Sequence, residues 1–231
     1  MKKYFKVVPF FNNEVVIDTN ETNYSSTLSR GKELEGLLLC ISYFSSNFGI
    51  PINVLYLVNN GLATIGNQYL QQIPRSNNGV FTADPFTKNP DDIQFVINEC
   101  DLINFIETTD KIGFKNPFEG FYIWEFLFEQ VREQLSTSLP KRTESFFLFE
   151  SVADCERYMS EIKRIGMICE VELMETKQLF RADMTFINDI PNNITANNVY
   201  SIAEKYWKGE SSENPLYEII FQGKCKLKPM E

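Results

Sequence analysis

The fold of this 231-residue chain is decided by the stretch Asn214-Pro215-Leu216-Tyr217-Glu218-Ile219-Ile220-Phe221-Gln222-Gly223. The stretch follows a proline, ends at a glycine and is rich in strand-forming residues, so it predicts a β-strand. Glu218 is its one carboxylate, and a strand holds such a group more rigidly than a loop does. Burial and neighbouring aromatic rings can tune a carboxylate for chemistry. The alternative interpretation is a glutamate that faces solvent on an edge strand.

The residues before this strand alternate between extended and helical patterns. Beyond Pro140 the sequence predicts a strand at 145–149, a helix at 152–163, a strand at 167–173, an extended piece at 178–186 and a helix through 199–207. After Glu218, three lysines recur at every second position (Lys224, Lys226 and Lys228), so a strand would place them on one face. They indicate either a basic stripe or a solvated sheet edge.

The first 140 residues are mainly helical in pattern. Helices are expected at 32–44, with an apolar stripe of Leu34, Leu37, Leu38 and Ile41, and at 118–135. Strands are expected at 4–9 and 15–17, residues 52–58 fit a strand or a helix, 71–92 are typical of a loop, and a helix is expected to follow Pro90. No linker separates two parts. The sequence therefore predicts one α+β domain over residues 1–231, in which residues 10–117 form a mainly helical elaboration.

Composition excludes several classes of protein. The 43% of hydrophobic residues and 20 phenylalanines predict a folded globular protein, and the net charge of −9 disfavours nonspecific binding to nucleic acid or anionic membranes. The N-terminus lacks the apolar core of a signal peptide, and no apolar run approaches a membrane span. We therefore expect a cytoplasmic protein with no membrane association.

The chain contains no histidine, which excludes Ser-His-Asp and Cys-His catalysis and histidine metal sites. No metal site is expected. The five cysteines are odd in number and form no C-x-x-C pair, so they fit a reducing compartment and are expected to be packing residues: Cys40, Cys100, Cys155, Cys169 and Cys225.

Two aromatic residues stand eleven positions apart, Phe147 on an expected strand and Tyr158 on the expected helix that follows. Two rings so placed can face each other across a slot and sandwich a flat ligand ring. Ordinary packing in the core is the alternative. Ser151 is the expected N-cap of that helix. In the turn before the strand, Arg142 is either a ligand for phosphate or carboxylate or a solvated turn residue.

Together these features resemble the ADP-ribosyltransferase fold, in the branch of diphtheria toxin and poly(ADP-ribose) polymerase. The chain also resembles an uncharacterised bacterial family of that fold. The resemblance covers about residues 118–228 and the opening strand, and it is carried by a series of short motifs: Glu129-Gln130-Val131-Arg132, Leu139-Pro140-Lys141-Arg142, Ser145-Phe146-Phe147, Tyr206-Trp207-Lys208-Gly209 and Pro215-Leu216-Tyr217-Glu218.

The resemblance implies a split β-sheet core formed by residues 118–231 with the opening strand 4–9. It also implies that NAD is the substrate, with its nicotinamide between Phe147 and Tyr158. Glu218 is then the catalytic residue, which stabilises positive charge on the ribose as nicotinamide leaves. Ser145, Arg142 and Lys6 are the further residues expected to bind NAD.

The chain departs from this pattern in three places. The opening strand offers Lys6 where the family has a histidine or arginine, and lysine lacks the arginine fork. Phe147 replaces a tyrosine, which keeps the ring and loses the hydroxyl. Leu216 stands two residues before Glu218, so the Glu-x-Glu pair of the arginine-modifying branch is absent.

Three functions follow from the sequence. The first is an NAD-dependent ADP-ribosyltransferase that modifies a macromolecular acceptor, such as a bacterial or phage conflict effector or toxin in phage defence. From the net charge, a protein is favoured over nucleic acid as the acceptor. The second is a binding or regulatory protein on the same fold that has lost catalysis, and the third is an unrelated α+β interaction protein. Residues 10–117 are expected to offer a surface for a protein partner.

Overall fold

A computed structural model describes residues 3–9, 13–28, 32–66, 68, 80–82, 94–96, 98–113, 121–163, 165–191 and 193–230. The chain divides into two compact units. Unit 1 consists of Met1–Ser29, Phe128–Asp189 and Ile202–Glu231, and unit 2 consists of Arg30–Leu127 and Ile190–Ser201. The expected elaboration falls mostly in unit 2 and the expected core mostly in unit 1. That the chain forms one domain stays a prediction.

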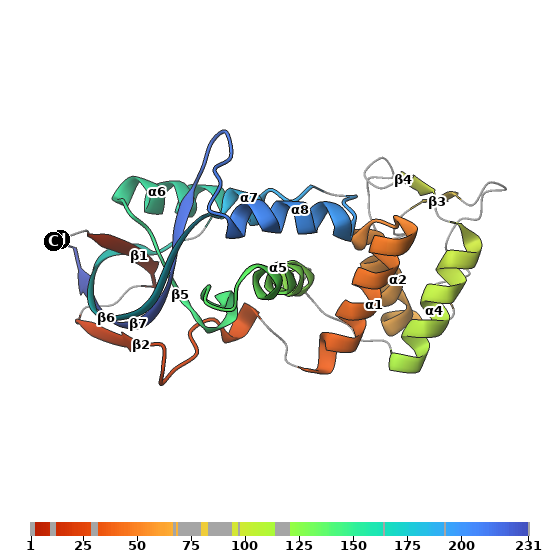
Figure 1. Ribbon diagram of the computed structural model, residues 1–231, viewed down its shortest axis with the longest axis horizontal. Helices are drawn as coiled ribbons and strands as arrows, with labels where there is room; N and C mark the ends of the chain where they lie inside the picture. The colour runs from red at the N-terminus through yellow and green to blue at the C-terminus, as the bar shows by residue number, and fades with distance from the viewer. Residues whose placement is uncertain are drawn as a thin grey trace. The chain divides into compact units, whose positions relative to one another are not determined.

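Unit 1 is built on an antiparallel sheet. Its strands are β1 (Tyr4–Val8), β2 (Val15–Asp18), β5 (Phe146–Leu148), β6 (Met167–Asp183) and β7 (Tyr217–Pro229). They run in the order β1-β6-β7-β2, and β5 also pairs with β7. Figure 1 shows β6 and β7 as the long, curved pair that carries the sheet. The α+β class is therefore confirmed, and Glu218 lies on the central strand rather than on an edge.

β6 is one strand of 17 residues where the sequence predicted two separate pieces. Two register shifts, between Leu173 and Glu175 and between Thr176 and Gln178, break its periodicity without ending its pairing with β7. Gly223 faces the second irregularity with a φ of 140°. A Cβ atom there would lie 2.1 Å from the carbonyl oxygen of Glu175, so only glycine fits.

The two faces of β7 differ in character. On one face, the side chains of alternate residues join the main core of unit 1: Ile219, Phe221, Cys225 and Leu227. The intervening side chains of Glu218, Ile220 and Gln222 point to the other face, as strand alternation requires. A slip of one residue would exchange the two sets, so the apolar pattern favours the observed register.

Four helical segments of unit 1 flank this sheet. They are α6 (Val152–Glu161), α7 (Thr185–Asn188) and the C-terminal parts of α5 (Phe121–Leu135) and α8 (Ala196–Trp207). The predicted cap is confirmed, because the hydroxyl of Ser151 accepts a hydrogen bond from the N–H of Asp154 at 3.0 Å. Glu129 and Arg132, three residues apart on α5, form an ion pair with Nε 2.7 Å from Oε2. The indole of Trp207 donates to the carbonyl of Phe128 at 2.7 Å and so ties α8 to α5.

Unit 2 contains α1 (Lys32–Phe48), α2 (Ile52–Ile65), α4 (Glu99–Ile112) and the paired strands β3 (Val80–Thr82) and β4 (Gln94–Val96). The predicted stripe of α1 is buried, but the helix ends four residues later than expected. The ambiguous segment 52–58 is helical.

The sequence was wrong about β3 and β4. Residues 80–82 lie within the expected loop, and residues 94–96 lie where a helix was expected. That helix begins instead at Glu99, where the Asn98 side chain accepts from the N–H of Cys100 at 2.9 Å. The rest of the expected loop at 71–79 and 83–92, and residues 118–120 of the helix expected at 118–135, lie outside the described residues.

The lysines of β7 do share one face, and each lies beside a carboxylate. Lys224 is 3.8 Å from Asp18, Lys226 is 2.8 Å from Glu14, and Lys228 is 2.5 Å from Glu172. Cross-strand partners thus neutralise the stripe.

Four of the five cysteines are buried as predicted, whereas Cys100 is exposed in the first turn of α4. The prediction that all five are packing residues was therefore wrong for Cys100.

Candidate functional site

Glu218 is the second residue of β7 and is 4% exposed. It pairs with Ala182 on β6, and two residues later Ile220 pairs with Phe147 on β5. The interpretation of Glu218 as a solvent-facing residue on an edge strand was therefore wrong. A carboxylate at such a depth needs partners, because burial of an isolated charge is costly.

Arg142 supplies the opposite charge. It lies in the 3-10 turn η2 (Arg142–Glu144) that precedes β5, it is 7% exposed, and its Nη1 donates to Oε1 of Glu218. The interpretation of Arg142 as a solvated turn residue was therefore wrong. Its role as a carboxylate ligand is realised inside the protein, toward Glu218.

Tyr206 is the third member of this group. Its hydroxyl donates to the same Oε1 of Glu218 at 2.7 Å, and Nη1 of Arg142 lies within hydrogen-bonding distance of that hydroxyl. The ring is fully buried and packs against Phe128 and Trp207, with centroids 5.2 and 4.9 Å apart. The end of α8 thus fixes the hydroxyl over the start of β7.

Phe147 completes what we call the Glu218 cluster, defined as Arg142, Phe147, Tyr206 and Glu218, and Ser145 lies next to it along the chain. The guanidinium carbon of Arg142 lies 4.8 Å from the ring centroid of half-buried Phe147. The hydroxyl of Ser145 donates to the carbonyl of Lys141 at 2.5 Å and accepts from Gln222 at 3.2 Å. Contacts therefore join three of the six residues expected from sequence, Arg142, Phe147 and Glu218, whereas the Ser145 hydroxyl lies against Gln222. Tyr206 was missed.

Tyr158 and Lys6 lie elsewhere in unit 1. The Tyr158 ring packs on Phe149, with centroids 5.1 Å apart, and the Lys6 ammonium lies 4.7 Å from the ring centroid of Phe146. Because alternate residues of a strand point the same way, Phe147 and Phe149 lie on one side of β5. Tyr158 therefore packs on the ring two positions beyond Phe147. That these two rings clamp a ligand stays a prediction.

The chain that enters β7 is held by a charged residue, Asp183, that the sequence did not single out. Asp183, at the end of β6 and 0% exposed, accepts hydrogen bonds from the N–H groups of Ser212, Leu216 and Thr185 at 2.7, 3.0 and 3.1 Å. Burial by itself would raise the pKa of Asp183, but its hydrogen bonds to Ser212 and Thr185 outweigh burial and hold that pKa below its ordinary value. The sequence does not signal this role, since the donors Ser212 and Leu216 are backbone groups that the fold brings near.

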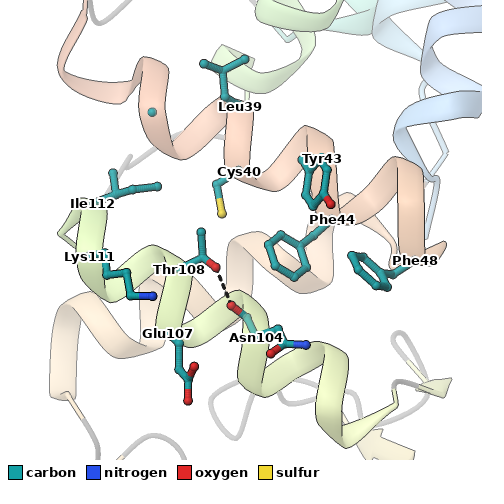
Figure 2. A pocket seen from close by; sticks show the side chains of 11 residues that line it. Leu39, Cys40, Tyr43, Phe44, Phe48, Asn104, Glu107, Thr108, Lys111 and Ile112 are labelled. Carbon is teal, nitrogen blue, oxygen red and sulfur yellow. Dashed lines mark hydrogen bonds between the residues drawn. The ribbon is translucent and has the colours of Figure 1, made fainter.

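A pocket of about 600 Å³ lies within unit 2, between α1 and α4. Figure 2 shows Cys40 and Phe44 on α1 facing Thr108 on α4, with Tyr43 and Phe48 at one end. Leu39, Tyr43 and Phe48 are 47, 57 and 41% exposed. Exposed apolar side chains around a hollow are typical of interaction sites. This pocket is a place to test the prediction that residues 10–117 offer a surface for a protein partner.

Residues 54–229 match the model of a family described as Protein of unknown function (DUF2441), and this match spans more than half of the chain. No curated protein matches the chain. In the part of the chain that the structure describes, no helix has both the length and the apolar character needed to cross a bilayer. Among the same residues no group of three or more acidic or cysteine side chains could hold a metal ion.

Proposed function

We propose that this chain, which belongs to the DUF2441 family of proteins of unknown function, is an NAD-dependent ADP-ribosyltransferase that uses Glu218 as its catalytic carboxylate. The observation that carries the proposal is the fixed orientation of Glu218. A guanidinium and a tyrosine hydroxyl hold it on the central strand of a curled antiparallel sheet, two residues from the pairing partner of Phe147.

The charge of Glu218 suits this chemistry. When nicotinamide leaves the ribose of NAD, positive charge develops on the sugar, and a nearby carboxylate stabilises it. Arg142 places an opposite charge directly beside the Glu218 carboxylate. Among the described residues, the bonds that Glu218 accepts from Arg142 and Tyr206 both end on Oε1. In this proposal Oε2 is the oxygen that faces the ribose.

The ring of Phe147 suits the leaving group. It is half-buried, and Arg142 already shows that a cationic group lies favourably against it. Nicotinamide is a flat, positively charged ring while it is bound to the ribose, so the same ring can stack on it. The further expected ligands of NAD remain Tyr158, Ser145, Arg142 and Lys6.

A second function is favoured by the burial of the same residue. The Glu218 side chain is 5% exposed and Arg142 neutralises it, so the pair has no net charge to offer a developing cation unless Arg142 withdraws. A binding or regulatory protein that keeps the fold without catalysis would retain this pair as a structural one. The first proposal, an active transferase, also includes three expectations from the sequence. These are a role in conflict with phage or other bacteria, a protein as the acceptor, and a cytoplasmic location.

Transfer of label from adenylate-labelled NAD into a cell lysate tests the proposal. The wild type is compared with Glu218→Gln and with Glu213→Gln, a matched change at an exposed carboxylate of the preceding loop. The proposal expects label with the wild type and Glu213→Gln, and its loss with Glu218→Gln. Equal labelling by all three removes Glu218 from the mechanism. The second function is favoured if NAD raises the melting temperature of the purified protein while no label is transferred in lysates from several sources.

A further inference from the structure

Asp183 fixes the backbone just before β7, the strand that carries Glu218. Its two oxygens accept from the N–H groups of Ser212 and Leu216, four residues apart on the loop that leads into β7. Asp183 accepts a third bond from Thr185, and the Thr185 hydroxyl accepts from the N–H of Leu216 at 3.1 Å. A buried carboxylate that accepts several N–H groups makes strong, directional bonds, so this loop has one defined path.

The pinned residue lies immediately before the paired part of β7. Leu216 is 1% exposed, and its carbonyl accepts from the N–H of Met184 at 2.8 Å. Tyr217 then pairs with Asp183 itself, and Glu218 pairs with the preceding residue of β6. The anchor and the catalytic carboxylate are thus separated by a single position of the ladder.

A second clamp acts on the same loop from α6. The guanidinium of Arg157 donates to the carbonyls of Asn214 and Pro215 at 3.0 and 2.9 Å, and to the amide oxygen of Asn214 at 3.2 Å. Arg157 is in turn held by Glu161 at 2.6 Å. Two elements from different parts of the sequence, β6 and α6, therefore fix one loop.

Register explains what this rigidity does. If Tyr217 entered the ladder one residue out of place, Glu218 would turn to the opposite face, away from Arg142 and Tyr206. We propose that Asp183 is a positioning residue for Glu218: it anchors the N–H groups of Ser212 and Leu216 and so sets the register in which Glu218 meets Arg142. The effect on catalysis rests on the proposed function, whereas the positioning itself does not.

A double-mutant cycle tests the positioning without any activity. Asp183→Asn and Glu218→Gln are made singly and together, and urea denaturation gives the folding equilibrium constant of each protein. We expect the double variant to differ by about fivefold or more from the product of the two single effects. The matched cycle of Asp189→Asn with Glu218→Gln, at an exposed aspartate beyond α7, is expected to be multiplicative. A multiplicative result for Asp183 as well overturns the proposal.

Kinetics separate positioning from simple loss of structure. In an active wild type, Asp183→Asn is expected to lower kcat by about tenfold to a hundredfold with little change in KM for NAD, because the carboxylate is misplaced. The double variant Asp183→Asn with Glu218→Gln is expected to have the same kcat as Glu218→Gln alone. A rise in KM with kcat unchanged, or additive losses, contradicts the proposal. If Asp183→Asn does not fold, Thr185→Ala removes one acceptor of Leu216 and takes its place in both tests.

A wild type that transfers no label removes the proposed function, and the thermodynamic cycle then still decides whether Asp183 positions Glu218. The two proposals therefore fail separately.

Discussion

Arg142 and Glu218 form a buried ion pair that joins the turn before β5 to the second residue of β7, with side chains 9 and 5% exposed. A pair at this depth stabilises little over an apolar contact, but the loss of one partner leaves a charge without its counterion. The pair therefore makes the fold of unit 1 depend on residues 76 positions apart.

Replacement of Arg142 tests this dependence. We expect Arg142→Met to lower the free energy of unfolding by about 3–5 kcal/mol near neutral pH, because the Glu218 carboxylate stays buried without its counterion and keeps the Tyr206 hydroxyl as a neutral donor. Urea denaturation measures the change. Lys208→Met, which removes the cation of an exposed pair with Glu204, is the control and is expected to have little effect. Equal effects of the two substitutions would show that Arg142 contributes no more than a surface cation.

The ring of Phe147 offers a second test, which rests on the proposed function. Phe147→Ala is expected to raise KM for NAD about tenfold or more, since stacking of a base on an aromatic ring is worth roughly 1–3 kcal/mol. Phe147→Tyr keeps the ring and is expected to stay near the wild-type value. Initial rates of nicotinamide release measure both. A large loss with tyrosine, or none with alanine, would remove Phe147 from the NAD site.

The lysines of β7 predict how the protein treats nucleic acid. Because Asp18, Glu14 and Glu172 lie beside them, we expect the wild type to bind single-stranded DNA more weakly than about 10⁻⁴ M near physiological salt. The triple variant Asp18→Asn, Glu14→Gln and Glu172→Gln frees three cations. Its binding is expected to strengthen, with a salt slope near −2 on logarithmic axes. Tight, salt-dependent binding by the wild type would contradict this prediction.

The cysteines predict a pattern of thiol reactivity. Burial raises the pKa of Cys155 and Cys225 to about 12 and that of Cys169 to about 11, and it also raises the pKa of Cys40. Cys100 is the exposed thiol. We expect an alkylating reagent to modify Cys100 first in the native protein and all five in urea, because the thiolate is the reactive form. Peptide mass mapping over time measures the order, and rapid modification of Cys169 would be inconsistent with its burial.

Much of unit 1 was predictable because its signals are local. Alternation on β7 assigned the lysines to one face, and Ser151 marked the start of α6 from its own sequence. β6 was divided in error because its two register shifts disturb the period of two while the ladder continues. β3 and β4 were missed since three-residue strands carry too little pattern to stand out from a polar loop.

The candidate site was predictable only in part. Glu218, Arg142 and Phe147 were found through short motifs that each lie on one element. Tyr206 was missed because its contact with Glu218 requires the end of α8 to lie over the sheet. The separation of twelve residues in the sequence does not predict that arrangement. Asp183 was missed for a similar reason, since its partners are backbone N–H groups on a distant loop.

Asp183 leads to the last prediction, on acid sensitivity. The pKa of Asp183 in the folded protein lies below its ordinary value of 3.8. Its contribution to stability is therefore fully present above that value and is lost as the pH falls through the lower, folded pKa. At about pH 7 we expect Asp183→Asn to lower the free energy of unfolding by about 1–3 kcal/mol, since an amide cannot accept all three N–H groups.

Below pH 3.8, that difference is expected to shrink as the pH falls through the lower, folded pKa and the wild-type carboxyl becomes protonated. Urea denaturation at several pH values between these limits measures the difference. The exposed control Asp189→Asn is expected to show a small effect that changes little with pH. A difference for Asp183→Asn that stays constant or grows on acidification would show that the ionised carboxylate does not hold the loop before β7.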